Sequence, residues 1–353
     1  MSDLMQVLDA NLNRSMEGLR VCEDLLRFSH GTEISFRLKI HRQYLGEIRQ
    51  ELGNEKLLAA RNTESDEQKF LDGNLEKKRK SVEDIFTANI KRAQESTRVI
   101  EEILKTIDLT MSNNIQKLRF TLYNDEVEAL SFIQRKNFQN QFYYSLYGIL
   151  DSEFLKRNYE KTAQEMIDGG VKVLQLRMKH ASSKEILKIA KKIAILCEKS
   201  GILFIMNDYP DIAVLSKAHG IHLGQDDIPV DEARKIVGDR SIIGISTHCE
   251  KDIDKALKTS ADYIAVGPVF GTTSKVKESL PAVGTDLISY ALEKSLVPVV
   301  PIGGITLENI EEILKKGALC PAVISALYKN DEIKKNSVSF VSKISHIQKE
   351  LSI

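Results

Sequence analysis

The sequence lacks an excess of charge of either sign. Lysine and arginine together number 50, and aspartate and glutamate together also number 50. A protein that binds nucleic acid usually carries a basic surface, and attraction to an anionic membrane needs the same excess. The balance therefore argues against nucleic acid and membrane as partners and favours small molecules.

Long apolar runs and paired cysteines are also missing. No apolar stretch approaches the ~18 residues that a membrane-spanning helix needs, and the N-terminus has no basic segment followed by an apolar one, as a secretory signal would. The four cysteines, Cys22, Cys197, Cys249 and Cys320, are scattered without C-x-x-C spacing. We expect a reduced, cytoplasmic protein.

The chain is long for one domain, and its composition changes near "RKNFQNQ" at residues 135–141. Residues 1–135 have helical spacing, few prolines and many charges, which predicts a separate all-helical domain. Residues 142–353 alternate short β-branched runs with segments that suit helices. This second half has the length of a (β/α) barrel, about 200 to 250 residues.

Eight apolar runs in the second half are candidates for strands. They are "YYSLYGIL", "VKVLQLRM", "GILFIMN", "GIHLG", "SIIGIS", "YIAVGPVF", "VPVVPIGG" and "AVISAL". Eight repeats of a strand followed by a helix predict an α/β fold, a closed (β/α)8 TIM barrel, although an open doubly wound sheet would alternate in the same way. The count favours the barrel, as does the clustering of polar and glycine residues where the runs end.

Charged side chains follow several of these runs. Gln175, Arg177 and Lys179 occupy alternate positions, so a strand would point all three the same way, and inward-facing cations need an anion. The alternative is a solvated strand end. Asp208 follows the next run, and Asp226 with Asp227 follows the run after it. Paired carboxylates suit Mg²⁺ that also binds substrate phosphates, whereas single aspartates after strands often cap the next helix.

The later runs end in small and hydroxyl-bearing residues. Ser246 ends the fifth run, where it could bond a phosphate or cap a helix, and the adjacent His248 and Cys249 have no identifiable orienting group, which favours a structural role for both. A polar loop, Thr272 to Lys275, follows the sixth run, and Gly303 and Gly304 end the seventh. Barrel phosphate sites commonly form after strands seven and eight, and Ser325 ends the eighth run.

Taken in order, "LQLRMK", "MNDYPDIA", "GIHLGQDDIP", "GIST", "VGPVFGTTSK", "PIGGIT" and "VISAL" resemble the motifs of the thiamine phosphate synthase family. The resemblance covers roughly residues 142 to 350. It implies a (β/α)8 barrel that joins hydroxymethylpyrimidine diphosphate to a thiazole phosphate, plain or carboxylated, with Mg²⁺, releasing diphosphate and forming thiamine phosphate. Two positions depart from the family pattern: Pro301 stands for a glycine and Ser274 for a threonine.

The resemblance also implies the site residues. The pyrimidine-diphosphate site corresponds to Gln175, Leu176, Arg177, Met178, Lys179, Asn207, Ser246 and Lys275. The thiazole-phosphate site corresponds to Thr272, Thr273, Ser274, Gly304, Ile324 and Ser325. Asp208 and Asp227 fall at the metal-ligand positions, whereas Asp226 does not. Because departing diphosphate gathers negative charge, the reaction needs cations more than a base, and Arg177, Lys179, Lys275 and the metal would supply them.

The first half contains a repeat. "ANLNRSMEGLRVCEDLL" begins at Ala10, and "ANIKRAQESTRVIEEIL" begins at Ala88. The shared apolar positions have helix-face spacing, so each copy is expected to be an amphipathic helix, with arginines one turn from glutamates. The shared apolar pairs are Leu8/Phe86, Leu12/Ile90, Cys22/Ile100 and Leu26/Leu104.

The duplication predicts two helices packed about a pseudo-two-fold axis. The polar residues retained in both copies would form a buried polar network or a ligand site, or they would serve the architecture of the helices alone. The candidates are Asn11, Arg14, Asn89 and Arg92. This half resembles the helical domain fused ahead of thiamine phosphate synthase in some bacteria, to which a hydroxymethylpyrimidine phosphate kinase role is attributed. The sequence has no G-x-x-x-x-G-K-[ST] loop, so no phosphate-binding motif supports a kinase.

Two alternative functions remain open on the sequence. The barrel could bind thiamine precursors as a sensor without catalysis, but both metal carboxylates and all the cations are present, which favours the enzyme. It could instead be a thiazole tautomerase of the same superfamily, whose chemistry needs a histidine that transfers protons. His222 is the one strand-borne candidate, and its position within "GIHLG" favours a packed core histidine.

Overall fold

The computed structural model describes residues 2–29, 31–61, 78–156, 158–271 and 281–351. The chain divides into two compact units, Met1–Gln134 and Arg135–Ile353, and each has its own hydrophobic core. Within the described ranges, no helix combines the length and the apolar character that crossing a membrane requires. All four cysteines are free thiols.

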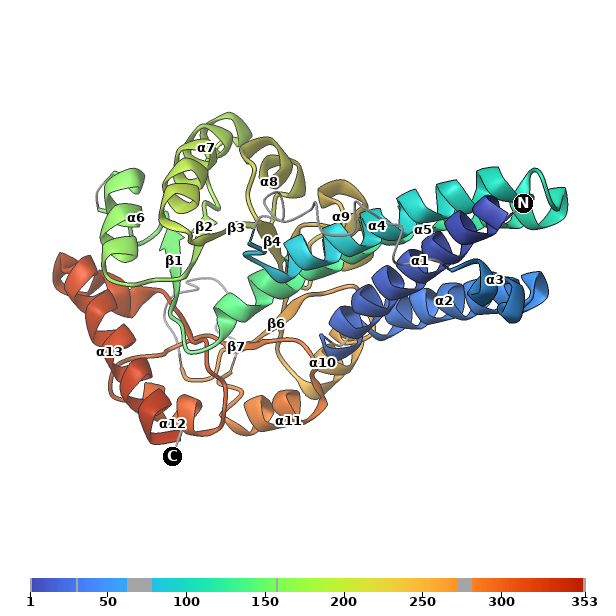
Figure 1. Ribbon diagram of the computed structural model, residues 1–353. Helices are drawn as coiled ribbons and strands as arrows, with labels where there is room; N and C mark the ends of the chain where they lie inside the picture. Colours follow the sequence, from blue (N-terminus) through green and yellow to red (C-terminus); the bar gives the residue numbers. More distant parts are fainter. Residues whose placement is uncertain (1, 30, 62–77, 157, 272–280, 352–353) are drawn as a thin grey trace. The chain divides into compact units, whose positions relative to one another are not determined.

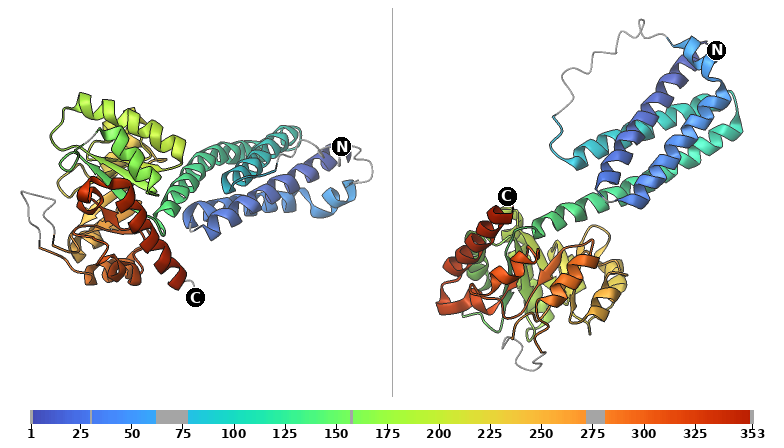
Figure 2. Two further views of the ribbon diagram at one scale, coloured as in Figure 1. Left: turned by 90° about the vertical axis from the view of Figure 1, so that its left-hand side faces the viewer. Right: turned by 90° about the horizontal axis from the view of Figure 1, so that it is seen from below.

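The first unit is a bundle of helices. They are α1 (Ser2–Phe28), α2 (Thr32–Leu52), α3 (Asn54–Ala60), α4 (Val82–Leu104) and most of α5 (Leu109–Gln139). Helix α1 packs against both α2 and α4 (Figure 2). The eight apolar positions shared by the two sequence repeats, which lie on α1 and α4, are all fully buried. The prediction of two amphipathic helices is therefore confirmed.

Helices α1 and α4 cross at equivalent positions of the repeat. Ser15 Oγ lies 3.4 Å from the carbonyl oxygen of Ala93, its counterpart in the second copy, and Cys22 Sγ lies 3.6 Å from the carbonyl oxygen of Phe86. The helices are thus antiparallel about a pseudo-dyad. Gly18 permits the approach, because a Cβ there would come within 2.6 Å of the Asn89 carbonyl oxygen.

Buried ion pairs occupy matching places in the two copies. Glu101 is fully buried; Arg98 donates to it over 2.7 Å and Arg119 of α5 over 2.8 Å. Glu23 occupies the equivalent position, with Arg20 at 3.4 Å and Arg42 of α2 at 3.0 Å. The arginines lie one turn from the glutamates, as the repeat predicts.

The duplication extends beyond the segment found in the sequence. Ser35, Leu38, Arg42 and Leu45 of α2 correspond to Ser112, Ile115, Arg119 and Leu122 of α5 at a constant offset. Both serines are buried, and the Ser112 hydroxyl donates to the Glu101 carbonyl over 2.9 Å. The first unit therefore consists of two related helical hairpins, each with its own arginine and glutamate pair.

The second unit is an eight-stranded parallel barrel. Its strands are β1 (Tyr147–Asp151), β2 (Val173–Arg177), β3 (Leu203–Asn207), β4 (Gly220–Leu223), β5 (Ile242–Thr247), β6 (Tyr263–Val266), β7 (Val299–Pro301) and β8 (Ala322–Val323). Every strand overlaps a run that the sequence predicted, and β1 and β5 extend one residue beyond theirs, to Asp151 and Thr247. The order β7-β6-β5-β4-β3-β2-β1-β8 is sequential, and a parallel bridge between Ile302 and Ala322 completes the circuit. The barrel prediction is confirmed.

Helices cover the outside of the strands (Figure 1). They are α6 (Tyr159–Asp168), α7 (Ser183–Ser200), α8 (Pro210–Ser216), α9 (Val230–Val237), α10 (Glu250–Ala256), α11 (Asp286–Lys294), α12 (Ile310–Lys315) and α13 (Ile333–Leu351), with short 3-10 helices η1 (Asn140–Phe142) and η2 (Ser325–Asp331). Strand residues alternate between the two faces of the sheet. Leu174 and Leu176 pack outward against the helices, and Val173 packs into the barrel interior.

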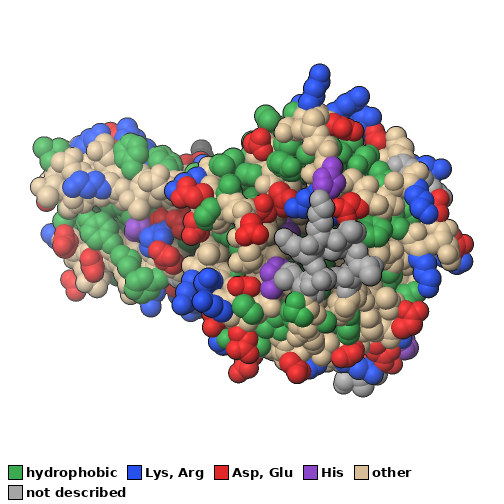
Figure 3. All heavy atoms as spheres, turned by 180° about the vertical axis from the view of Figure 1, so that it is seen from behind, with side chains coloured by type: hydrophobic (Ala, Val, Ile, Leu, Met, Phe, Trp, Pro, Cys, Tyr) green, Lys and Arg blue, Asp and Glu red, His purple; other side chains and the backbone are tan. Residues whose placement is uncertain are grey.

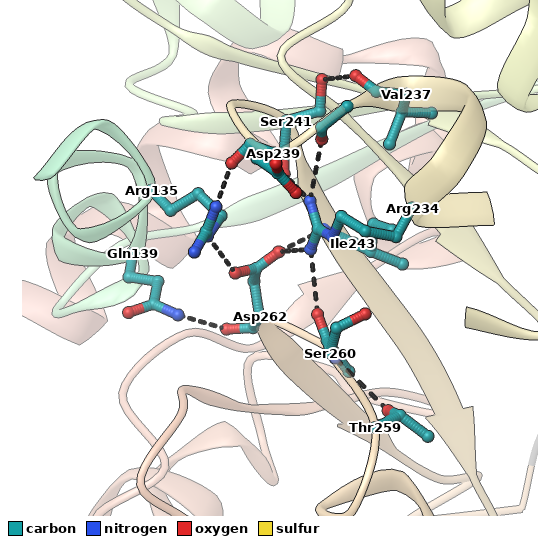
Figure 4. A network of polar contacts seen from close by, with 12 residues as sticks. Arg135, Gln139, Arg234, Val237, Asp239, Ser241, Ile243, Thr259, Ser260 and Asp262 are labelled. Carbon is teal, nitrogen blue, oxygen red and sulfur yellow. Dashed lines mark hydrogen bonds and ion pairs between the residues drawn. The ribbon is translucent and has the colours of Figure 1, made fainter. Parts of the chain in front are cut away.

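The end of α5 belongs to the barrel unit, where Asp262 holds it (Figure 4). Arg135 Nε lies 3.2 Å from Asp262 Oδ1, and Gln139 donates to the Asp262 carbonyl over 2.8 Å. Arg234 lies 2.5 Å from the other carboxylate oxygen, and the Ile243 amide donates to it over 2.8 Å. Burial raises the pKa of Asp262 despite the two guanidinium groups. Residues from Arg135 onward thus contribute to the folded barrel.

Candidate active site

A cavity of about 450 Å³ opens at the carboxyl ends of the barrel strands. Figure 3 shows acidic, basic and histidine side chains close together on one face of the barrel. The cavity is lined by these residues predicted from the sequence: Gln175, Arg177, Lys179, Asn207, Asp208, Asp227, Ser246, Gly304, Ile324 and Ser325. Sequence positions 150 residues apart thus contribute to one site.

Arg177 is held at the cavity wall by a carboxylate that sequence reasoning missed. Asp151 ends β1 and is paired in register with Arg177 at the end of β2. Its Oδ2 lies 2.6 Å from Arg177 Nη1, and its Oδ1 accepts from the Glu153 amide over 2.9 Å. Asp151 is fully buried. The available signal was an aspartate directly after the first run, where several other runs are also followed by polar residues.

Lys179 and the two predicted metal ligands form one cluster. Lys179 Nζ lies 2.7 Å from Asp208 Oδ2, and Asp208 has a left-handed backbone, with φ of 65°. Burial raises the pKa of Asp227; the Gly224 amide, which donates to Asp227 Oδ2 over 2.6 Å, lowers it, and the neighbouring Asp208 carboxyl raises it further. The ionised form of Asp227 is therefore costly beside the Asp208 carboxyl, and a bound cation would reduce that cost.

The described residues hold no cluster of three or more histidine, cysteine, aspartate or glutamate side chains with metal-site geometry. Asp208 and Asp227 therefore stand as a pair. Asp226 is exposed and does not line the cavity. A pair of carboxylates suits Mg²⁺, which keeps several waters and usually takes only one or two protein carboxylates beside substrate phosphates.

The glycines after β7 form the opposite wall. Gly303 and Gly304 have φ of 100° and 65°, which favour glycine. A Cβ on Gly304 would come within 2.6 Å of the Gly271 carbonyl oxygen, and Asn309 donates to the Gly304 carbonyl over 2.9 Å. Ile324 and Ser325 follow β8 beside them. Backbone here approaches the cavity without side chains in the way.

Some predicted residues lie elsewhere. Leu176 and Met178 point into the apolar layer between strands and helices, not into the cavity. Thr272, Thr273, Ser274 and Lys275 lie outside the described residues. His222 is buried, with 8% of its surface exposed, as the sequence favoured, but its ring faces the barrel interior and lines the cavity.

Two family models match the chain. The model described as thiamine monophosphate synthase matches residues 146–327, and that of the ThiD2 family matches residues 6–128. A thiamine-phosphate synthase of Prochlorococcus marinus subsp. pastoris is 38% identical over 97% of this chain and 96% of its own length. One from Thermosynechococcus vestitus is 37% identical over 92% and 90%. The solved thiamine phosphate pyrophosphorylase from Pyrococcus furiosus is 30% identical, with a TM-score of 0.55, over 60% of this chain and 99% of that one.

Proposed function

We propose, because the chain belongs to the thiamine-phosphate synthase family, that its barrel cavity binds the pyrimidine diphosphate with Arg177 and Lys179 facing the leaving group. The reaction of the family condenses 4-amino-2-methyl-5-(diphosphooxymethyl)pyrimidine with thiazole phosphate in thiamine biosynthesis. The chain is therefore a transferase, and the alternative function as a non-catalytic sensor is rejected. The observation that carries the assignment is the pair of cations held by Asp151 and Asp208.

The fixed cations explain how the cavity would promote the reaction. When the carbon–oxygen bond to diphosphate breaks, the electron pair leaves with the oxygen, and positive charge develops on the pyrimidine methylene. Groups already oriented toward the leaving oxygens stabilise that charge without reorganising. Arg177 can donate two N–H bonds to one phosphate, and Asp151 fixes the guanidinium for that purpose. The thiazole nitrogen then attacks the carbon, so no covalent enzyme nucleophile is needed.

Asp208 and Asp227 fit Mg²⁺ by the chemistry of their donors. Both offer carboxylate oxygens, and the raised pKa of Asp227 reflects a burial and like-charge cost that a cation would remove. The bound metal would neutralise negative charge on the diphosphate oxygens. Lys179, bonded to Asp208, would stay beside the same phosphates. Asn207, directly before Asp208, lines the cavity next to this pair.

The glycine wall would hold the thiazole phosphate. Gly304, Ile324 and Ser325 line the cavity where barrels commonly bind phosphate, and the resemblance adds Thr272, Thr273 and Ser274, with Lys275 as a further cation. The cytoplasmic location expected from the sequence stays a prediction, as does the lack of nucleic-acid and membrane partners.

The barrel is expected to act alone. A fragment of residues 130–353, assayed with both substrates, should form thiamine phosphate only when Mg²⁺ is added. Nearly all of the Pyrococcus furiosus chain is matched by 60% of this one, which supports this independence. A fragment starting at residue 138 is the matched comparison: it lacks Arg135 and should unfold at lower urea concentration, because Asp262 loses a partner. A folded 130–353 fragment without turnover would contradict the proposal.

For the helical unit we propose binding of hydroxymethylpyrimidine phosphate between the two repeat copies. Arg14 and Arg92 directly precede Ser15 and Ala93, which meet at the crossing, and both arginines are exposed. A phosphate lying across the pseudo-dyad could contact both. Asn11 and Asn89 contribute to the helices themselves. The side-chain amide of each donates to the backbone carbonyl four residues earlier in its own helix, over 2.8 Å in both copies.

Calorimetric titration of the full chain with hydroxymethylpyrimidine phosphate tests this proposal. Arg14→Ala and Arg92→Ala should each weaken binding by about tenfold or more, the loss of one charge-assisted contact. The helix content should stay the same, because both side chains are on the surface. Arg177→Ala, in the barrel cavity, is the control that separates the two sites, because it should weaken binding in the cavity and leave binding to the helical unit unchanged. If the wild type shows no binding of hydroxymethylpyrimidine phosphate apart from that in the barrel cavity, the proposal that the helical unit binds this ligand is wrong.

A further inference from the structure

A continuous chain of hydrogen bonds crosses the floor of the cavity. Gln175 Nε2 donates to the Tyr147 hydroxyl over 3.1 Å, and the hydroxyls of Tyr147 and Tyr263 lie 3.0 Å apart. The Tyr263 hydroxyl lies 3.0 Å from His222 Nδ1, and His222 Nε2 lies 3.0 Å from Ser246 Oγ. The five side chains come from β2, β1, β6, β4 and β5.

The glutamine and the two tyrosines of this hydrogen-bond chain are buried in the barrel. Tyr147 and Tyr263 are almost fully buried, and Gln175 is 3% exposed. The His222 and Tyr263 rings stack, with centroids 5.6 Å apart. Burial raises the pKa of both tyrosines above the ordinary value, so both keep their phenolic protons. Each hydroxyl therefore supplies one proton to the chain.

One direction of donation gives every hydroxyl proton in the chain an acceptor. With Gln175 donating to Tyr147, the Tyr147 proton points to Tyr263 and the Tyr263 proton to His222 Nδ1. Nδ1 is then an acceptor, so the neutral imidazole carries its proton on Nε2 and donates it to Ser246 Oγ. The Ser246 proton is left for an acceptor in the cavity.

We propose that Tyr147, Tyr263 and His222 are positioning residues that make Ser246 a hydrogen-bond donor to the substrate pyrimidine. The cavity walls near Ser246 are apolar and include Ile149, Ala265 and Val300. The cations proposed to face the diphosphate, Arg177 and Lys179, lie at the rim of the cavity. A heteroaromatic ring fits between apolar walls, and its ring nitrogen is the acceptor that a serine proton would meet. The same chain leaves the Gln175 carbonyl oxygen available to an amine hydrogen.

This inference rests on the proposed placement of the pyrimidine, and one measurement is independent of it. Nitrogen-15 NMR of histidine-labelled full-length protein, at slightly alkaline pH, distinguishes the two neutral imidazole tautomers. His222 should carry its proton on Nε2, and Tyr263→Phe should shift its Nδ1 resonance by removing the donor. A proton on Nδ1, or a doubly protonated ring, in the wild type would overturn the proposal.

A double-mutant cycle tests the effect on the substrate. Ser246→Ala should lower kcat/KM by about tenfold, the loss of one hydrogen bond, and His222→Phe should lower it similarly. If His222 acts through Ser246, adding His222→Phe to Ser246→Ala should cost little more. His222→Gln should restore much of the loss, because its amide can donate to Ser246. If His222→Phe lowers kcat/KM by the same factor in the wild type and in Ser246→Ala, His222 does not act through Ser246 and has only a packing role.

The two proposals fail in different ways. If the cavity does not bind the pyrimidine diphosphate, Arg177→Ala keeps full turnover while the His222 tautomer is still on Nε2. If the floor chain does not position Ser246, Arg177→Ala loses turnover while the double-mutant cycle is additive. Should His222→Phe fail to fold, the Gln variant and the tautomer measurement still decide the question.

Discussion

Replacing Asp227 with asparagine is expected to lower turnover by about 10²- to 10³-fold, the size of effect seen when a group that stabilises charge in the transition state is removed. Asp208→Asn should cause a similar loss, because the proposed cation needs both carboxylates. Asp226→Asn is the matched control: it removes the same charge from the next residue, which is exposed and outside the cavity. Steady-state rates at saturating Mg²⁺ measure all three. Equal losses at Asp226 and Asp227 would contradict the assignment.

Asp227→Asn should also be more stable than the wild type when divalent cations are removed. The pKa of Asp227 is raised in the folded protein, first by burial. An acid with a raised folded pKa destabilises the fold when it is ionised, so this cost is present above the folded pKa and disappears as pH falls through it. Asp227→Asn should therefore raise Tm near neutral pH, and the gain should vanish in acid below the ordinary aspartate pKa of about 3.9. A gain that persists there would point to another cause.

Glu101→Ala is expected to destabilise the helical unit by about 3 to 5 kcal/mol, the cost of breaking a buried ion pair. Arg119 would lose the partner that it meets at 2.8 Å, and Arg98 the one at 2.7 Å. Glu23→Ala should have a similar effect through Arg42 and Arg20. Arg14→Ala, on the exposed surface of the same bundle, should change stability by about 0.5 kcal/mol or less.

Hydrogen exchange on the full chain can measure these effects separately in the two units. Peptides from α4 and α5 should lose protection in Glu101→Ala, while barrel peptides serve as the internal reference. Unchanged exchange in α4 would mean that Glu101 is not needed for the fold. A large loss in Arg14→Ala would instead assign this repeat position to architecture rather than to a ligand.

The sequence was informative where physical chemistry acts locally. The eight apolar runs became strands because short apolar runs rich in β-branched residues and bounded by turn residues suit buried strands. Asp208 and Asp227 lie close together because the carboxyl ends of parallel strands share an edge. The repeat on α1 and α4 was visible because polar identities were kept. Its continuation on α2 and α5 was missed, since only a few widely separated positions match.

Features that depend on long-range register were not predictable. Asp151 supports Arg177 only because β1 and β2 pair with those two residues opposite. Leu176 and Met178 belong to the family motif by position, yet alternation turns both toward the helices. His222 was rightly expected to be buried, but its partner Tyr263 is 41 residues away. Such contacts follow from the diameter and closure of the barrel.

The closure itself has a further consequence. Strands β1 and β2 pair along five positions, whereas β7 and β8 meet through the single Ile302–Ala322 bridge. Regions with few interstrand bonds open at lower free energy than the rest of a fold. The glycines after β7 and Ser325 after β8 lie on the two sides of this gap in the ladder. A phosphate bound by residues on both sides would link β7 to β8. We therefore expect the barrel without substrate to open locally between these two strands, and bound substrate to suppress that opening.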